Sequence, residues 1–121
     1  RCLSRGLGDV YKRQTLSGSI GMLPSASLNS SSQGMYEPCH GSAPDIAHLN
    51  VANPIAMILS LSMAFKHSLE LPQLAEQLDN CVRQFISKGY RTKDLTDDDN
   101  FIYTNKVASK ILDILDEFEN D

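Results

Sequence analysis

The hydrophobic and polar positions divide the chain into a strand-like first part and a helical second part. Two short apolar runs, Ile20–Leu28 and Met35–Tyr36, are separated by a polar stretch of asparagine, serine, glutamine and glycine over residues 29–34. Short apolar runs bounded by turn-forming residues are typical of strands. We therefore expect two short strands, followed by a loop over residues 41–53 that contains glycine, proline and asparagine.

The spacing of apolar residues becomes helical after this loop. Asn53 is a good N-cap and Pro54 a good first residue for a helix that we expect to end near His67. Apolar residues extend almost all round this segment, and a helix with apolar residues on most faces is a buried one.

Two more helices are expected towards the C-terminus. One begins at Pro72 and is stopped by Gly89, and the next begins near Thr104, whose hydroxyl can cap it. Residues three and four apart share a helix face, so these sequences predict two buried stripes. Their members are Leu74, Leu78, Cys81, Val82 and Phe85 in the first helix, and Val107, Ile111, Ile114, Leu115 and Phe118 in the second.

Two short strands followed by three helices predict one part of an α/β fold. The 121 residues allow a single domain. A layer of three helices needs a sheet to cover, and two strands of this length seldom stand alone. We therefore expect an α/β domain whose sheet is incomplete in this chain.

Composition limits the class of protein further. The net charge of −4 argues against a large cationic surface for nucleic acid or anionic lipid. Three cysteines without a CxxC pair suit a reducing cytosol better than a disulfide scaffold or a zinc finger. The richest apolar stretch, Ile55–Phe65, is interrupted by two serines and is shorter than the roughly 20 residues of a membrane helix. We expect a cytoplasmic protein with no nucleic-acid or membrane partner.

The first fourteen residues differ in charge from the rest. They carry four basic side chains and one acidic, whereas the remaining 107 residues carry seven basic and fourteen acidic side chains. Such a break indicates either a basic arm that binds nucleic acid or a foreign leader joined to the chain. We favour the foreign leader and place the domain itself at residues 15–121.

The segment with the most chemical information runs from Glu37 to Asn53. The pattern predicts a strand end that leads through a loop into a capped helix, and ligands of open α/β folds commonly bind at such positions. Asp45 follows a proline, and its carboxylate could accept hydrogen bonds from the two hydroxyls of a ribose, which would favour NAD over NADP. From the pattern alone, Asp45 could equally close a local Asx turn.

Several stretches of this sequence resemble the sequences of a known family. The stretch Thr15–Leu28 (TLSGSIGMLPSASL), Tyr36–Pro38 and His40–Ala47 (HGSAPDIA) closely resemble the C-terminal part of the isocitrate/isopropylmalate dehydrogenase family, in its 3-isopropylmalate branch. The resemblance runs from Thr15 to the end of the chain. It implies NAD-dependent oxidation of 3-isopropylmalate and decarboxylation to 2-oxoisocaproate, a step of leucine biosynthesis. Tartrate and homoisocitrate relatives remain alternatives.

The resemblance also implies how the loop binds the cofactor. His40 would pack against the adenine, Asp45 would take the ribose hydroxyls, and Asn53 would read the adenine edge. The NADP-using relatives have Lys and Tyr where this chain has Asp45 and Ile46, so both positions indicate NAD. The complete set of expected cofactor residues is His40, Gly41, Ser42, Ala43, Asp45, Ile46, Ala52 and Asn53.

Two further positions near this loop receive weaker expectations. The resemblance places Glu37 nearer the nicotinamide end of the cofactor. His48 and Leu49 stand where the family commonly has a Gly-Lys pair, so we predict a loop tip of different shape and assign His48 no ligand role.

The resemblance further implies that much of the enzyme is missing from this chain. The aspartates that bind Mg²⁺ or Mn²⁺, the Tyr and Lys acid–base pair and the substrate-binding arginines all lie upstream of the part that matches Thr15. We therefore expect no catalytic residue and no metal ligand here, and no turnover by the chain alone. The family forms homodimers, mostly through the other domain. The alternative from a different class is a non-catalytic helical interaction module.

Overall fold

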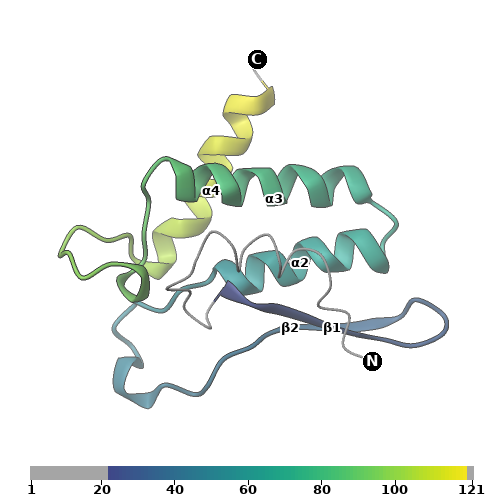
Figure 1. The fold of residues 1–121 in the computed structure, drawn as a ribbon, viewed down its shortest axis with the longest axis horizontal. Coiled ribbons are helices and arrows are strands. Elements are labelled where there is room, and N and C mark those ends of the chain that lie inside the picture. Colours follow the sequence, from purple (N-terminus) through teal and green to yellow (C-terminus); the bar gives the residue numbers. More distant parts are fainter. Residues whose placement is uncertain (1–21, 120–121) are drawn as a thin grey trace.

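The computed structural model describes residues 22–119, so the segment 1–14 lies outside the described residues. The elements, shown in Figure 1, follow in the order β1 (Pro24–Leu28), β2 (Gly34–Pro38), the 3-10 turn η2 (Pro44–Ile46), α2 (Ile55–His67), α3 (Pro72–Ser87), the 3-10 turn η3 (Lys93–Leu95) and α4 (Thr104–Glu119). Within the described part, no helix is long and apolar enough to cross a membrane.

The two strands form an antiparallel hairpin. β1 pairs with β2 from Pro24 opposite Pro38 to Leu28 opposite Gly34. The first strand was expected over residues 20–28, but it begins at Pro24, and residues 20–21 are not described. Neither member of the pair Pro24–Pro38 has an amide hydrogen to donate, so the regular ladder ends there, and the Cys39 amide makes one further bond to the carbonyl of Leu23 at 2.9 Å. The apolar Met22 is instead buried against the helices.

The second strand is longer than the expected Met35–Tyr36, because it pairs with β1 along its whole length. Between the strands, Asn29 Oδ1 accepts hydrogen bonds from the amides of Ser31 (2.8 Å) and Gln33 (3.0 Å). These bonds close the turn through an asparagine side chain, as is common in tight turns.

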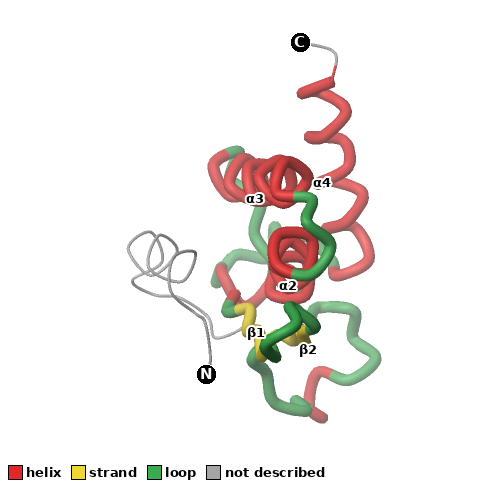
Figure 2. Tube along the Cα trace, turned by 90° about the vertical axis from the view of Figure 1, so that its right-hand side faces the viewer, coloured by secondary structure: helices red, strands yellow, loops and turns green. Residues whose placement is uncertain are grey.

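The helices and the hairpin are stacked in layers. Figure 2 shows α2 between the hairpin and α3, with α4 alongside. The three expected helices are therefore present. The core that joins them consists of Met22, Ile55, Leu59, Cys81, Val82, Phe85, Val107, Ile111 and Ile114.

The start of α2 differs slightly from the expectation. Asn53 does supply capping chemistry, because its Oδ1 accepts a hydrogen bond from the Ile55 amide at 3.0 Å. The first helical carbonyl, however, is that of Pro54, which accepts from the Ile58 amide at 3.1 Å. Pro54 therefore occupies the N-cap position and is not the first residue of the helix.

The end of α3 is a Schellman motif. Gly89 has φ 86°, in the left-handed region that glycine adopts without a Cβ clash. Its amide donates to the carbonyl of Ile86 (3.0 Å), and the Tyr90 amide donates to that of Phe85 (3.2 Å). The rings of Phe85 and Tyr90 pack with their centroids 5.2 Å apart, which is the apolar contact that usually accompanies this motif.

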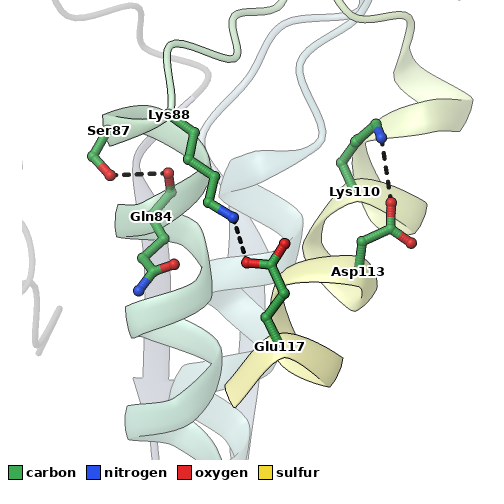
Figure 3. A network of polar contacts seen from close by, with 6 residues as sticks. All are labelled: Gln84, Ser87, Lys88, Lys110, Asp113 and Glu117. Carbon is green, nitrogen blue, oxygen red and sulfur yellow. Dashed lines mark hydrogen bonds and ion pairs between the residues drawn. The ribbon is translucent and has the colours of Figure 1, made fainter. Parts of the chain in front are cut away.

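Two predictions about α3 and α4 were wrong in part. Leu74 is 45% exposed and Phe118 is 44% exposed, because each lies near a helix end that no described element covers. The contact found for the Thr104 hydroxyl is with another element, since it donates to the carbonyl of Ala52 at 2.6 Å, and Thr104 is the first residue of α4 and not the residue before it. Figure 3 shows the contact that joins the C-terminal halves of these helices, the ion pair of Lys88 with Glu117.

A carboxyl group is buried between α2 and α3. Asp79 is 9% exposed, and its Oδ1 lies 2.7 Å from the Ser62 hydroxyl, which is also 3.1 Å from the carbonyl of Ala75. Burial raises the pKa of Asp79 above its ordinary 3.8, although Ser62 and the nearby Arg83 oppose the shift. The Ser62 hydroxyl has only one hydrogen for two acceptors, so a protonated Asp79 that donates to Ser62 would satisfy all three groups.

We expect Asp79→Asn to stabilise the chain at pH 7 and to have little effect at pH 3. Because the pKa of Asp79 is raised on folding, its contribution to stability is greatest below pH 3.8 and falls as the pH rises through the folded pKa. An asparagine amide supplies the same donor without a charge. Urea unfolding at the two pH values measures the difference. The exposed Asp97→Asn is the matched control, and an equal gain for Asp79→Asn at both pH values would contradict the prediction.

Candidate functional site

A groove lies where the loop after β2 meets the segment before α4. Figure 1 shows the long β2–α2 loop projecting away from the helix layers. The groove has a volume of about 930 Å³, within the usual range of small-molecule sites. Its lining consists of Pro38, Cys39, His40, Gly41, Ser42, Ala43, Ile46, Ala47, His48, Asn50, Val51, Ala52, Asn53, Ala56, Met57, Asp94 and Thr104.

The structure brings most of the expected cofactor residues to this groove. Seven of the eight line it, namely His40, Gly41, Ser42, Ala43, Ile46, Ala52 and Asn53. The eighth, Asp45, is exposed and lies outside the lining, between Pro44 and Ile46 on η2. Glu37 also lies outside the lining, on β2.

Backbone hydrogen bonds shape the first half of the loop. Ala43 has φ 39° and precedes η2, and its carbonyl accepts from the Ile46 amide at 3.1 Å. A Cβ added to Gly41 would meet no atom within 4 Å. Packing within the described chain therefore does not require a glycine at position 41, which leaves room for a ligand there.

Asp45 is available to a ligand. Its carboxylate makes no hydrogen bond or ion pair with another described residue, so the structure does not support the alternative in which Asp45 closes an Asx turn. A free carboxylate can accept two hydrogen bonds from a diol.

Asn53 is held in one orientation by two partners. Its Oδ1 accepts from the Ile55 amide, and its Nδ2 donates to Asp94 Oδ2 at 3.1 Å. The other carboxylate oxygen of Asp94 accepts from the Thr92 hydroxyl at 2.6 Å, and Thr92 is fully buried. The Asn53 side chain thus keeps one Nδ2 hydrogen for a ligand, and Asp94 positions it.

Asp94 is the residue that sequence reasoning missed. It belongs to the stretch 91–95, whose sequence has no local sign of a binding site. Asp94 lines the groove beside Asn53 although the two are 41 residues apart in sequence. Only the packing of two remote loops could have revealed it.

The second half of the loop is attached to α4. The carbonyl of Asn50 accepts from the Thr104 amide at 2.9 Å, and Asn50 Oδ1 accepts from the Asn105 amide at 3.2 Å. Together with the bond from the Thr104 hydroxyl to Ala52, these contacts hold the groove between two elements far apart in sequence.

The groove is suited to binding. It is lined by small and apolar side chains with a few polar groups, as small-molecule sites commonly are. Within residues 22–119, no group of three or more histidine, cysteine or acidic side chains could hold a metal ion. The described residues therefore do not fit the divalent metal of the family, and we derive no metal chemistry from them.

Known proteins similar to the chain point to one family. A family model described as "Isocitrate/isopropylmalate dehydrogenase" matches residues 8–111. The 3-isopropylmalate dehydrogenase of Buchnera aphidicola subsp. Diuraphis noxia is 52% identical over 110 residues, which are 89% of this chain and 30% of that protein. A protein of the same name from Buchnera aphidicola subsp. Uroleucon rurale is 46% identical, over 89% of this chain and 87% of its own sequence.

Solved structures are similar as well. Isocitrate dehydrogenase from Methylococcus capsulatus has a TM-score of 0.74 and 33% identity, over 81% of this chain and 28% of its own. A β-decarboxylating dehydrogenase from Thermococcus kodakarensis has a TM-score of 0.75 and 32% identity, over 94% of this chain and 32% of its own. The chain thus spans about 30% of the length of most of these relatives. It belongs to the isocitrate/isopropylmalate dehydrogenase family.

Proposed function

We propose that residues 15–121 are the C-terminal part of an NAD-dependent 3-isopropylmalate dehydrogenase and bind the adenosine half of its cofactor. The relatives with this name are about 50% identical to the chain, and it spans about 30% of most of them. The whole enzyme would oxidise and decarboxylate 3-isopropylmalate in leucine biosynthesis. It would act as a cytoplasmic homodimer. Residues 1–14 would be a foreign leader, although the match to the family model begins at residue 8.

The groove is the observation that carries the cofactor proposal. Seven residues expected to bind NAD line this groove. Asp45, whose carboxylate has no partner among the described residues, lies on the same loop within η2, outside the lining. This carboxylate would accept hydrogen bonds from the adenosine ribose of NAD. In NADP the 2′-hydroxyl of that ribose carries a phosphate, which would repel Asp45.

The residues of this chain would bind the cofactor, and residues in the rest of the enzyme would carry out catalysis. NAD bound here would accept a hydride from the substrate hydroxyl carbon. The residues of this chain would hold the adenosine, with Asn53 fixed by Asp94 and Gly41 leaving space. The acid–base pair, the substrate arginines and the ligands of Mg²⁺ or Mn²⁺ would come from the part of the enzyme upstream of residue 15.

Titration of the 121-residue chain with NAD, NADP and adenosine tests the proposal. We expect NAD to shift the NMR signals of the groove residues, and NADP to bind about tenfold or more weakly because of the charge repulsion at Asp45. Signals of α3 residues outside the groove serve as the internal control. Equal affinity for NAD and NADP, or no shift with either, would contradict the proposed cofactor.

A further inference from the structure

The side-chain amide of Asn53 is restricted to one orientation by its two partners. Asn53 Oδ1 accepts from the Ile55 amide at 3.0 Å, and Nδ2 donates to Asp94 Oδ2 at 3.1 Å. If the amide were rotated by half a turn, its oxygen would face the carboxylate of Asp94, and its Nδ2 group would face the N–H of Ile55. Two acceptors and two donors would then meet. Asp94 and Ile55 therefore favour the same orientation of Asn53.

Asp94 is itself held by the protein, although its side chain is exposed. Asp94 Oδ1 accepts from the hydroxyl of Thr92 at 2.6 Å, and Thr92 is fully buried. The segment before Thr92 is anchored in turn. The Ile102 amide donates to the carbonyl of Arg91 at 2.7 Å, and the Arg91 guanidinium donates to the carbonyl of Ile86, in the last turn of α3, at 2.6 Å. Asp94 is thus fixed to the end of α3.

The orientation of the amide decides what the Asn53 side chain offers to a ligand. Asn53 lines the groove. Its oxygen is bonded to the first turn of α2 and one Nδ2 hydrogen is bonded to Asp94, so the second Nδ2 hydrogen is the donor that remains for a ligand. A donor that is already held in place loses less conformational entropy on binding than a freely rotating one.

We infer that Asp94 is a positioning residue for the nucleotide that the groove binds; this inference rests on the proposed binding of NAD. Both carboxylate oxygens of Asp94 are engaged by side chains of the protein, so its role is to hold Asn53 and not to contact the ligand. Without Asp94, the Asn53 amide loses the acceptor that excludes the rotated orientation. The resemblance assigns Asn53 to the adenine, so NAD and adenosine should respond alike.

The first test needs no ligand. In NMR spectra of the 121-residue chain, Asp94→Ala should move the two Nδ2 proton signals of Asn53 towards those of the exposed Asn100, because Asn53 loses a charged acceptor. Asp97→Ala removes an exposed carboxylate from the same loop and should leave the Asn53 signals in place. Unchanged Asn53 signals in Asp94→Ala would overturn the inference whether or not the chain binds NAD.

The second test is titration of the same chain with adenosine and with NAD. Asp94→Ala should weaken both about two- to fivefold, since water competes for an exposed hydrogen bond. Asp94→Asn should restore most of the affinity, because its side-chain oxygen can accept from Asn53 while its amide group donates to the Thr92 hydroxyl. A loss in Asp94→Asn as large as that in Asp94→Ala would show that the charge matters and not the positioning, and would contradict the inference.

A double-mutant cycle tests whether Asp94 acts through Asn53. In the Asn53→Ala background, Asp94→Ala should cause no further loss of adenosine affinity. Urea unfolding of each variant establishes that it is folded under the titration conditions. If the unmodified chain binds NAD and adenosine but the two losses are additive, only the role of Asp94 is overturned. If the unmodified chain binds neither, the proposed function fails and the role of Asp94 in binding fails with it.

Discussion

Replacement of Phe85 by alanine is expected to lower the free energy of unfolding by about 3–5 kcal/mol. The Phe85 side chain is fully buried in the core shared by α2, α3 and α4, and its ring also packs on Tyr90 at the Schellman motif. The substitution removes a large apolar surface from the core and leaves a cavity. Since folded domains are stable by only about 5–15 kcal/mol, the variant should unfold at a much lower urea concentration. Circular dichroism during urea titration measures this.

Leu74→Ala is the matched control on the same helix. Leu74 is 45% exposed, and substitutions at such positions usually change stability by less than about 0.5 kcal/mol. A cost for Phe85→Ala no larger than that for Leu74→Ala would mean that the three helices do not share the core described above.

The helical half of the fold could largely be predicted from the sequence, because local rules determine it. The three- and four-residue spacing of Val82 and Phe85 indicated the buried face of α3, and Gly89 indicated its end. The start of α2 was misplaced by one residue, and the larger errors lie where the tertiary packing decides. The Thr104 hydroxyl bonds to Ala52, and Leu74 is left uncovered by the described elements.

The candidate site could be predicted only along one segment. A resemblance to known sequences indicated eight cofactor residues between His40 and Asn53, and seven of the eight line one groove. Asp94 could not be predicted, because its place depends on how the loop before α4 packs against the loop before α2.

Asp45→Ala is expected to weaken NAD binding by about ten- to a hundredfold. A hydrogen bond to a charged group contributes about 1.5–3 kcal/mol, and the exposed carboxylate would make its bonds to the ribose hydroxyls. The same substitution removes the repulsion of the NADP phosphate, so NADP should lose much less affinity than NAD, or gain some. Titration calorimetry with the two cofactors gives the ratio of their dissociation constants.

The ratio tests the role of Asp45 more sharply than either affinity alone. A general disturbance of the loop would weaken NAD and NADP binding together and leave the ratio unchanged, whereas loss of a charge at the ribose changes the ratio. Asp97→Ala makes the same change in net charge in an exposed stretch between η3 and α4 that does not line the groove, and should leave the ratio as it is. If Asp45→Ala and Asp97→Ala give the same ratio, the carboxylate of Asp45 does not select the cofactor. The selection would then have to come from other residues, among which the resemblance indicates Ile46.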